Sequence, residues 1–393
     1  MSRSASATAL LSVLLLSSLP TTIGCGSGAL GGDQGDPTPA EDAAPPVKAS
    51  ELGAGDHSPG SVKLTEIAGP AAKLNKPRDL AFNVRRPDEL WVVNLGDESM
   101  TLIFDASTDR RRTERRKDAD AMHFMANPAA ISFGADETTI GVPGTLSTCG
   151  ESRNTYDGMK APNDFMGPTL WSSDLSIFAM KNPFKLGSHL DMLHDSPNCM
   201  GLAHETANVY WAFSGQTNAI VKYDFGTDHG VGEDDHSDGQ SWEYARGVVK
   251  YVPGVPSHLF FDPTDAMLYI ADTGNGRISK LDTSSGTRGV KLPTKESRVG
   301  FWRMNGAEVT DVVPPSFGLV APSGLEIKGD YVYVSDNATS RITAFTRAGE
   351  QVNYLDTGLP PGSLSGMAFG PDGRLYFVDI LGNRVLRIDP PAP

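Results

Sequence analysis

The chain of 393 residues is acidic, with 48 Asp and Glu residues against 34 Lys and Arg residues and a net charge of −14. This charge excludes nucleic acid as the default partner, because phosphate backbones are bound by clusters of positive charge. The 42 glycines and 28 prolines exclude a helical bundle and favour many short strands joined by turns.

The first 24 residues have the pattern of a secretion signal. Arg3 supplies one positive charge, and an apolar run from Ala9 to Leu19 follows it. These 11 residues are too few for a membrane-spanning helix, which needs about 20. The segment 1–24 is therefore predicted to be a cleaved signal peptide rather than a membrane anchor.

The apolar run is followed by the sequence TIGC, which ends at Cys25. This sequence resembles the lipobox of bacterial lipoproteins, although Thr22 stands where Leu is usual. The resemblance implies that Cys25 carries lipid and anchors the mature chain to a membrane of the cell envelope, facing the periplasm or the exterior. The alternative is ordinary cleavage nearby, which would give a soluble secreted protein.

Residues 25–61 are rich in Gly, Pro, Ala and Asp. Such a segment buries too little apolar surface to offset the entropy lost when a chain is ordered. We therefore expect the lipidated Cys25 to be followed by a disordered linker that ends at residue 61.

One unit of sequence recurs through residues 62–389. A Pro-x-x-apolar motif opens it, a short strand and a turn follow, and a second strand ends in Asp or Asn before a Gly/Asn turn and a third strand. The apolar anchors of the six first strands are Leu80, Ile131, Leu202, Leu259, Leu325 and Met367. A four-stranded blade needs about 40 to 50 residues, so each interval holds one blade and the longer intervals carry insertions. The expected fold is all-β, a six-bladed β-propeller.

The two ends of the repeat region complete each other. The last copy stops after its third strand at Ile388, while a further strand, residues 62–67, precedes the first copy. This N-terminal strand is expected to close the last blade as its outer strand, which protects the sheet edges.

The copies resemble NHL repeats, most clearly in the turn ADTGNGR at residues 271–277. The resemblance covers residues 62–389 and implies a propeller fold. NHL propellers include protein-binding, RNA-binding and enzymatic members, so the resemblance leaves the function open. Where the second strands end, Asp272, Asp336 and Asp379 are expected to accept backbone N–H groups of tight turns rather than to bind metal.

Loops that enter a blade share one face of a propeller with the loops between strands two and three. On that face, the position before each first-strand anchor lies near the central channel and holds Asp79, Ala130, Gly201, His258, Gly324 and Gly366. Asp79 and His258 stand out among small residues and predict a ligand or metal site at the channel mouth. The candidate residues are Arg78, Asp79, Tyr156, His194, Asp195 and His258. The alternative is that His258 bonds a neighbouring carbonyl.

Cys149 and Cys199 are the two cysteines of the repeat region. They belong to two long insertions, residues 144–167 and 182–199, which are expected on the same face in adjacent blades. Outside the cytoplasm a pair of thiols is more often a disulfide than a reactive site, so a disulfide is predicted. The alternative is two free thiols.

The opposite face is expected to carry an acidic loop, residues 228–239, between strands three and four of the third repeat. Its candidate metal ligands are Asp228, His229, Asp234, His236 and Asp238. Their order imitates a calcium loop, but Ala245 occupies the place of the bidentate Glu. Carboxylate and imidazole together suit zinc, so Ca²⁺ or Zn²⁺ is the candidate cofactor, and a solvated acidic loop is the alternative. A basic run, residues 109–118, is expected as a loop on the same face, either solvated or paired with the acidic loop.

No nucleophile elbow, P-loop, dinucleotide fingerprint or His-Glu-x-x-His motif occurs in the sequence. The first hypothesis is therefore a monomeric binding module for a protein or small-molecule ligand, through the long loops of the second and third repeats, with no nucleic acid partner. The alternative is a metal-dependent hydrolase or lyase with its site in the central channel.

Two six-bladed enzyme families bear on that alternative. The repeats resemble those of the peptide-amidating lyase, whose zinc histidines directly follow the Pro of the Pro-x-x-apolar motif. The corresponding positions here are Arg78, Ala129, Ser257 and Ser323. Lactonases and gluconolactonase-like hydrolases hold calcium in the channel with Glu, Asn and Asp, and only Asp79 matches them, loosely. The missing zinc triad favours binding over catalysis.

Overall fold

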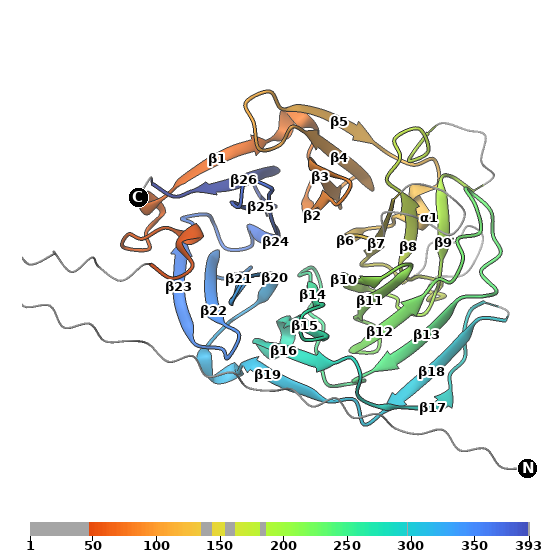
Figure 1. The fold of residues 1–393 in the computed structure, drawn as a ribbon. Helices are drawn as coiled ribbons and strands as arrows, with labels where there is room; N and C mark the ends of the chain where they lie inside the picture. Colours follow the sequence, from red (N-terminus) through yellow and green to blue (C-terminus); the bar gives the residue numbers. More distant parts are fainter. Residues whose placement is uncertain (1–46, 135–143, 154–161, 181–185, 297, 392–393) are drawn as a thin grey trace, which may run out of the picture. The chain divides into compact units, whose positions relative to one another are not determined.

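The structure is a computed structural model that describes residues 47–134, 144–153, 162–180, 186–296 and 298–391. Within these ranges the strands form six sheets, arranged in a ring around a central axis (Figure 1). The first strand of each sheet lies nearest the axis, and later strands lie farther out. The all-β, six-bladed propeller predicted from the repeats is therefore confirmed.

Blades 1 to 3 each begin at a predicted first strand. Blade 1 contains β2 (Pro77–Asn83), β3 (Arg86–Asn94), β4 (Ser99–Phe104) and β5 (Arg112–Arg116). Blade 2 contains β6 (Pro128–Phe133), β7 (Thr145–Gly150), β8 (Thr169–Ser172) and β9 (His189–Met192). Blade 3 begins with β10 (Cys199–Thr206), β11 (Val209–Ser214), β12 (Ala219–Asp224) and β13 (Gln240–Tyr244).

Blades 4 to 6 complete the ring. Blade 4 contains β14 (Leu259–Asp262), β15 (Met267–Asp272), β16 (Arg277–Asp282) and β19 (Val309–Val313). Blade 5 contains β20 (Pro322–Lys328), β21 (Tyr331–Asp336), β22 (Arg341–Thr346) and β23 (Gln351–Asp356). Blade 6 contains β24 (Leu364–Phe369), β25 (Leu375–Asp379), β26 (Arg384–Asp389) and β1 (Lys63–Ala68).

The N-terminal strand closes the ring, as the sequence predicts. β1 pairs antiparallel with β26, and Leu64 stands opposite Ile388. Figure 1 shows these two strands, the first and the last of the described residues, side by side in one sheet. Hydrogen bonds between β1 and β26 therefore hold the propeller closed.

The long interval between the fourth and fifth repeats contains a hairpin that leaves its own blade. β17 (Thr287–Lys291) and β18 (Gly300–Asn305) lie between β16 and β19 in the chain, yet they extend blade 3. β18 runs parallel to β13, with Trp302 opposite Trp242. Blade 3 thereby becomes a six-stranded sheet, and the segment before β18 reaches the boundary with blade 2.

Helical segments are short and connect the strands. They are α1 (Ala121–Phe124) and five 3-10 turns, η1 (Ser50–Leu52), η2 (Pro59–Ser61), η3 (Pro70–Ala72), η4 (Thr273–Asn275) and η5 (Pro315–Phe317). Among the described residues, none of these helices is long and apolar enough to cross a membrane.

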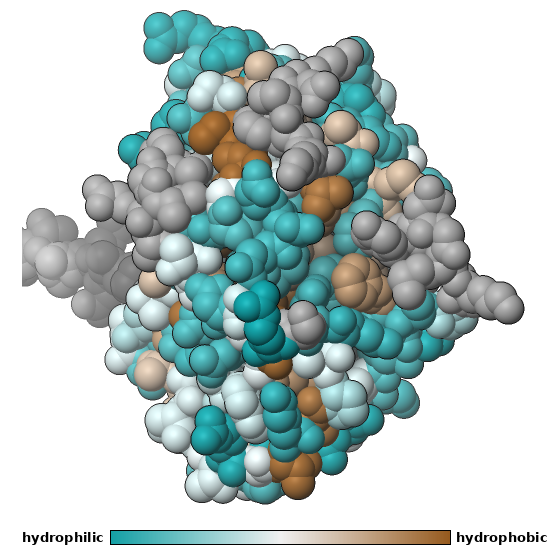
Figure 2. All heavy atoms as spheres, turned by 90° about the vertical axis from the view of Figure 1, so that its right-hand side faces the viewer, coloured by the Kyte–Doolittle hydropathy of each residue, from teal (hydrophilic) through white to brown (hydrophobic). Residues whose placement is uncertain are grey.

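A cluster of buried apolar side chains fills each junction between neighbouring blades. At the first junction, Trp91 of blade 1 packs edge-on against Phe133 of blade 2, with ring centroids 5.6 Å apart. Full burial of one such side chain stabilises the fold by about 1.5–3 kcal/mol relative to exposure. The outer surface over blades 2 and 3 is mostly hydrophilic, with only scattered apolar side chains (Figure 2).

The packed part of the chain begins at Val47, well before the predicted end of the linker at residue 61. Ala49 and Leu52 are buried against blades 5 and 6. The Asn353 side chain donates hydrogen bonds to the backbone carbonyls of Lys48, Ala49 and Gly53. Burial of Ala49 and Leu52 and the hydrogen bonds of Asn353 hold this segment against the propeller. Amino-acid composition alone does not reveal these contacts.

Blade 2 departs most from the sequence-based expectation. The repeat that begins at Pro128 predicts a second strand over residues 139–142, which lie outside the described residues. The second strand among the described residues is β7, which contains Cys149. The segment containing His189, expected as an entry loop to blade 3, is the outer strand β9, paired with β8. The expectation was wrong because β9 has only four residues and all of them are buried, so it shows no alternating pattern.

The basic run at residues 109–118 is also not the loop that was expected, because its centre forms the outer strand β5. Arg115 bonds Asp97 with 2.6 Å between Nη2 and Oδ2, and Arg116 pairs with Glu114. Arg112 lies over the Phe104 ring. These three arginines contact side chains of their own blade. The positive run therefore needs no phosphate or other external anion to account for it.

Two of the aspartates that end the second strands accept N–H groups of the turn that follows, as predicted: Asp336 accepts that of Ala338 at 3.0 Å, and Asp379 accepts that of Gly382 at 3.0 Å. Asp272 instead accepts the N–H of Lys250 at 2.8 Å, from the segment that enters its blade, and Asp336 also accepts the N–H of Val320 at 2.7 Å.

Candidate functional site

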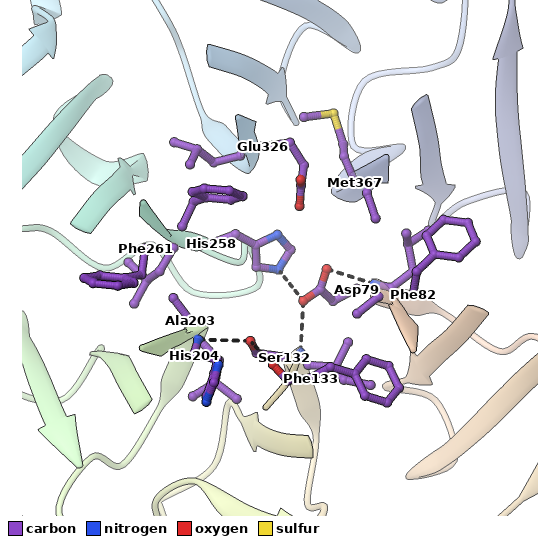
Figure 3. A pocket seen from close by; sticks show the side chains of 18 of the residues that line it. Asp79, Phe82, Ser132, Phe133, Ala203, His204, His258, Phe261, Glu326 and Met367 are labelled. Atoms are coloured by element: carbon purple, nitrogen blue, oxygen red, sulfur yellow. Dashed lines mark hydrogen bonds and ion pairs between the residues drawn. The ribbon is translucent and has the colours of Figure 1, made fainter. Parts of the chain in front are cut away.

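A cavity of about 400 Å³ lies in the central channel, and the first strands of all six blades line it (Figure 3). Side chains alternate along a strand, so the residues just before and just after each apolar anchor face the channel together. The row after the anchors holds Ala81, Ser132, Ala203, Phe260, Glu326 and Ala368. Glu326 is the only ionisable residue of this row.

The row before the anchors is crowded. A Cβ atom at Gly201 would stand 2.0 Å from the Ser257 carbonyl oxygen, and one at Gly366 would stand 2.1 Å from Oδ1 of Asp79. The inner strands therefore approach so closely that only glycine fits at these positions. Asp79 and His258, which carry larger groups in this row, occupy space that the glycines leave.

Asp79 and His258 lie close together in the channel, with Oδ2 of Asp79 3.7 Å from Nε2 of His258. The same imidazole nitrogen lies 3.2 Å from the Ala129 carbonyl oxygen, which is the carbonyl bond that the sequence left open as the alternative. The Asp79 carboxylate also accepts the N–H groups of Leu80 and Ile131, at 2.8 and 2.9 Å. Burial raises the pKa of Asp79 above its usual value, although His258 and the two backbone donors oppose the shift.

Glu326 is a site residue that the sequence reasoning missed. Its carboxylate points into the channel near Asp79 and His258 (Figure 3), and it makes no hydrogen bond or ion pair with any described residue. Burial raises the pKa of Glu326 well above its usual value, and the neighbouring Asp79 charge adds to the shift. The signal that could have found it is the strand alternation that marks Asp79 and His258, applied two residues later.

The remaining lining of the cavity is a mixture of aliphatic and aromatic side chains, and its phenylalanines are Phe82, Phe133, Phe260, Phe261 and Phe369. The rings of Phe82, Phe133 and Phe369 pack edge-on against other aromatic rings of the blades, whereas Phe260 lies in the row after the anchors, which faces the channel. An aromatic face attracts cations and tolerates the apolar part of a ligand. The channel thus combines two carboxyl groups and two imidazoles, those of His204 and His258, with a largely apolar lining.

Arg78, predicted at the channel mouth, does not line this cavity. It is buried, its Nη1 donates to the Gly254 carbonyl at 2.5 Å, and its Nη2 lies 3.8 Å from Glu151. Tyr156, another predicted residue of the mouth, lies outside the described residues.

His194 and Asp195 do not lie at the channel, because they follow the outer strand β9. His194 pairs through Nδ1 with Glu296, and its Nε2 lies 3.5 Å from Nε2 of His123. Burial would raise the pKa of Glu296, but the pairing with His194 outweighs it and leaves that pKa lowered. Asp195 accepts a hydrogen bond from Oγ of Ser241 in blade 3, at 2.6 Å, and burial raises its pKa to about 6.

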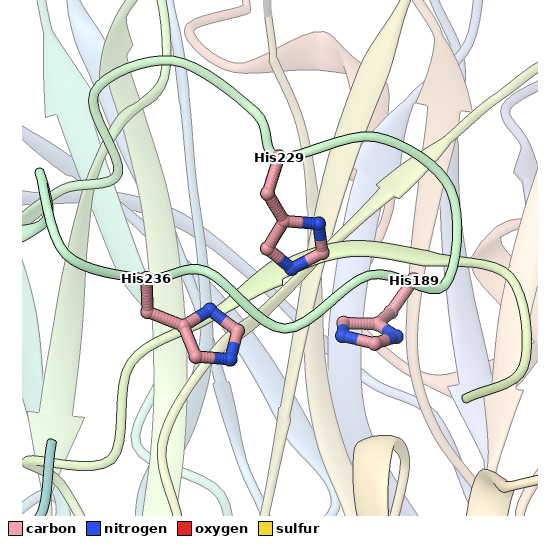
Figure 4. A group of neighbouring side chains, drawn as sticks. All are labelled: His189, His229 and His236. Carbon is pink, nitrogen blue, oxygen red and sulfur yellow. The ribbon is translucent and has the colours of Figure 1, made fainter. Parts of the chain in front are cut away.

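A second cluster of ionisable residues occupies the outer edge between blades 2 and 3. The cluster contains His189, His229 and His236 (Figure 4). One ring nitrogen of each residue lies within 4.8 Å of a ring nitrogen of each of the other two. His189 begins β9 of blade 2, whereas His229 and His236 belong to the acidic loop of blade 3. The prediction that residues 182–199, which include His189, and the acidic loop lie on opposite faces was wrong. The acidic loop crosses the outer strand of the neighbouring blade and so reaches His189.

Backbone hydrogen bonds fix the acidic loop against β9. The N–H of His229 donates to the Leu190 carbonyl at 3.2 Å, and the N–H of Gly232 donates to the His189 carbonyl at 2.8 Å. The carboxylates of Asp228, Asp234 and Asp238 do not belong to the three-histidine group within the described residues. Asp238 instead accepts the N–H of Thr227 at 2.9 Å.

The disulfide between Cys149 and Cys199 is confirmed. It joins the end of β7 to the start of β10, with the two Cα atoms 5.5 Å apart. Both cysteines are buried at the junction of blades 2 and 3. The bond therefore fastens together the two blades whose outer edges carry the histidine cluster.

These features define the protein as a six-bladed β-propeller with a polar cavity in its channel. No family model matches the chain, and no curated protein matches it. Among solved structures, an auxiliary nutrient binding protein from Bacteroides ovatus ATCC 8483 is similar in fold, with a TM-score of 0.51 and 13% identity over 81% of this chain and 70% of that chain.

Two enzymes are also similar, with lower TM-scores. A catalytically inactive virginiamycin B lyase from Staphylococcus aureus, with quinupristin, has a TM-score of 0.48 and 12% identity over 84% of this chain and 88% of that chain. A luciferin-regenerating enzyme has a TM-score of 0.49 and 11% identity over 84% of this chain and 95% of that chain. At these identities the likeness concerns the fold alone.

Proposed function

We propose that this protein is an extracytoplasmic binding propeller of NHL type, anchored through lipid on Cys25, that binds a small organic cation in its central channel. The observation that carries the proposal is the carboxylate of Glu326, which has no partner among the described residues and lies beside Asp79 in the channel cavity. An amine or quaternary ammonium group would complete this arrangement.

The electrostatic argument concerns the cost of an unpaired charge in a narrow channel, where Glu326 is half-buried. A carboxylate partly removed from water without a partner is destabilised, and the raised pKa of Glu326 agrees with that cost. A bound cation supplies the missing opposite charge, so ligand binding and ionisation of Glu326 favour each other. The net charge of −14 also draws cations toward the protein.

The dimensions fit a small ligand. The cavity of about 400 Å³ falls at the lower end of the size range of ligand pockets, which is about 300–1,000 Å³. Phe260, in the row that faces the channel, suits the alkyl groups of a substituted ammonium ion. The Bacteroides ovatus protein of similar fold is a nutrient binding protein, which is compatible with such a role.

The long loops of blades 2 and 3 stay a predicted surface for a protein ligand, and residues 154–161 and 181–185 of these insertions lie outside the described residues. The channel is the better-supported site for a small molecule, because its polar groups converge on one cavity.

A hydrolase or lyase acting in the same channel is the second candidate function. The 3.7 Å approach of Asp79 to His258 favours it, because an imidazole beside a carboxylate can accept and return a proton. The two functions differ in one outcome, since an enzyme converts the bound cation or ester to product and a binding protein returns it unchanged.

The binding proposal can be tested with choline, ethanolamine and putrescine as probes. Each is added to the purified protein, and the Tm and the heat of binding are measured. The neutral isostere 3,3-dimethylbutan-1-ol serves as the matched ligand control. We expect at least one amine to raise the Tm while the neutral isostere does not.

The variant Glu326→Gln should abolish that rise, because it removes the charge and keeps the shape. Glu350→Gln, at an exposed position, is the matched control and should bind as the original protein does. An equal rise with the neutral isostere, retained binding in Glu326→Gln, or no rise with any amine would each contradict the proposal. Recovery of the probe by mass spectrometry separates binding from turnover.

A further inference from the structure

We infer that His189, His229 and His236 form a transition-metal site, suited to Zn²⁺, at the outer edge between blades 2 and 3. The site is separate from the channel and does not depend on the proposed binding function. It differs from the ligand set predicted from the sequence, because β9 supplies His189 in place of the loop carboxylates.

The first observation is the orientation of two of the imidazoles. Nδ1 of His189 lies 2.7 Å from the Leu186 carbonyl oxygen, and Nδ1 of His229 lies 2.7 Å from the Gly230 carbonyl oxygen. A carbonyl only accepts hydrogen bonds, so in each ring the proton resides on Nδ1 and the lone pair on Nε2. A neutral imidazole in this tautomer presents Nε2 as a metal ligand.

The third imidazole is oriented by a carboxylate. Nδ1 of His236 lies 2.7 Å from Oδ1 of Asp191, which is fully buried in β9. A carboxylate behind a histidine is the usual outer partner of a metal-bound imidazole, because it fixes the ring and makes the other nitrogen more basic. All three rings therefore direct Nε2 away from their hydrogen-bonded side.

The second observation is that two of these Nε2 atoms lack partners. Nε2 of His189 and Nε2 of His229 are buried and make no hydrogen bond within the described part of the chain. His189 is fully buried as a residue. An unsatisfied buried acceptor is costly, so two of them directed toward one space indicate that a ligand satisfies both.

The third observation is the spacing. The ligand nitrogens of the three residues lie within 4.8 Å of one another, and Figure 4 shows the rings around a common space. A zinc ion bound at about 2.0–2.1 Å from each nitrogen requires only a small closure of the rings. Nitrogen ligands select zinc, copper, nickel or cobalt over calcium, which prefers oxygen.

Three protein ligands leave one position of a tetrahedral zinc ion for water or a further ligand. A cavity of about 490 Å³ adjoins the cluster, and His189 and His236 are part of its lining. Other polar groups on the same walls are His123, His194, Asp234, Lys295 and Glu296. The geometry therefore provides room for a fourth ligand beside two of the three histidines.

The test uses the full chain without a histidine tag, stripped of metal with a chelator. Zn²⁺ is titrated in competition with a chromophoric chelator, and Co²⁺ is added separately to record its absorption spectrum. We expect one Zn²⁺ per chain and the intense visible bands of tetrahedral Co²⁺. His229→Gln should weaken Zn²⁺ binding at least 100-fold, and Asp191→Asn about 10- to 100-fold.

His204→Gln is the matched control, because this imidazole bonds the Ala207 carbonyl in blade 3 and is not in the cluster. It should leave Zn²⁺ affinity unchanged, and circular dichroism should report folded protein for every variant. If His189→Ala fails to fold, the partly exposed His236 provides the second ligand variant, His236→Gln. Absence of stoichiometric Zn²⁺ in folded protein would overturn the site. So would a Zn²⁺ affinity of His229→Gln and His236→Gln equal to that of the original protein.

Failure of this experiment is distinguishable from failure of the proposed channel function. Glu326→Gln should bind Zn²⁺ like the original protein, and His229→Gln should bind the amine probe like the original protein. A loss of both activities in either variant would show that the two sites are not independent.

Discussion

Nδ1 of His236 and Oδ1 of Asp191 lie 2.7 Å apart, in different blades and separated by 45 residues of sequence. Asp191 belongs to the outer strand of blade 2, and His236 belongs to the loop that blade 3 extends across that strand. The bond also links two pKa values. Burial raises the pKa of Asp191 to about 6, and for His236 the pairing with Asp191 outweighs burial and leaves the pKa raised.

The metal-free protein should lose stability as the pH falls below 6.5, because of buried neutral histidines. Burial lowers the pKa of His189 to about 3 and that of His229 to about 4. The unfolded chain binds protons at these residues near pH 6.5 and the folded chain does not, so stability is complete above pH 6.5 and is lost as the pH falls toward 4. Each group contributes a slope of about 1.4 kcal/mol per pH unit in that window.

Urea unfolding of the metal-free protein between pH 7.5 and 4.5 measures this effect. His229→Gln should reduce the slope of the unfolding free energy against pH by about 1.4 kcal/mol per pH unit, the contribution of one proton. The exposed control Glu350→Gln should not change that slope between pH 7.5 and 5.5. Identical slopes for the original protein and His229→Gln would contradict the buried, neutral state of His229.

Glu326→Gln should stabilise the ligand-free protein at neutral pH. The folded-state pKa of Glu326 is raised by burial and by Asp79, so the folded chain keeps a proton that the unfolded chain has released. The original protein therefore becomes less stable as the pH rises from the unfolded-state pKa through the raised pKa. The amide carries no charge and removes this dependence.

Calorimetric Tm values at pH 5 and pH 8 report the difference. We expect the gain in Tm of Glu326→Gln over the original protein to be larger at pH 8. A Tm of Glu326→Gln below that of the original protein at pH 8 would indicate that the carboxylate stabilises the channel. The same probe amines should bind the original protein more tightly at pH 8 than at pH 5.

Removal of the disulfide should destabilise the protein markedly. The bond between Cys149 and Cys199 closes a loop with a sequence separation of 50 residues, which corresponds to about 3 to 5 kcal/mol in the chain-entropy model. The double variant Cys149→Ser with Cys199→Ser should show this loss in urea unfolding, and dithiothreitol should reduce the stability of the original protein alone. A loss below about 1 kcal/mol would show that the folded blades hold the two strands together unaided.

Asn353→Ala should release the segment that precedes the first strand. The Asn353 amide donates to three backbone carbonyls of residues 48–53, so its loss leaves buried acceptors unpaired and costs about 1–3 kcal/mol. Limited proteolysis should then cut near residue 50 much faster. Gln351→Ala, an exposed position of the same strand, is the control and should leave the cleavage rate unchanged.

Cys25→Ser should move the protein from the membrane fraction to the soluble fraction. Lipid attachment needs the thiol of Cys25, and the apolar run before it is too short to span a bilayer. Fractionation of a bacterial expression host and metabolic labelling with a fatty acid would measure the change. Equal membrane association of both forms would refute the lipid anchor.

The architecture was predictable from the amino-acid sequence, because strand alternation and turn residues recur locally in every repeat. Anchors such as Leu80 and Leu259 mark the inner strands, and the strand that precedes the first repeat completes the last blade. The disulfide between Cys149 and Cys199 was also predictable, since adjacent repeats place the two cysteines at one junction.

Which polar groups lie close together at the outer edge and in the channel depends on the packing of the folded chain. His189 joins His229 because an irregular loop crosses from one blade to the next, and no repeat encodes that crossing. Glu326 acquires its significance from burial beside Asp79, which depends on how closely six inner strands approach the axis. Local periodicity specifies the blades, whereas contacts between insertions arise from packing between segments distant in the chain.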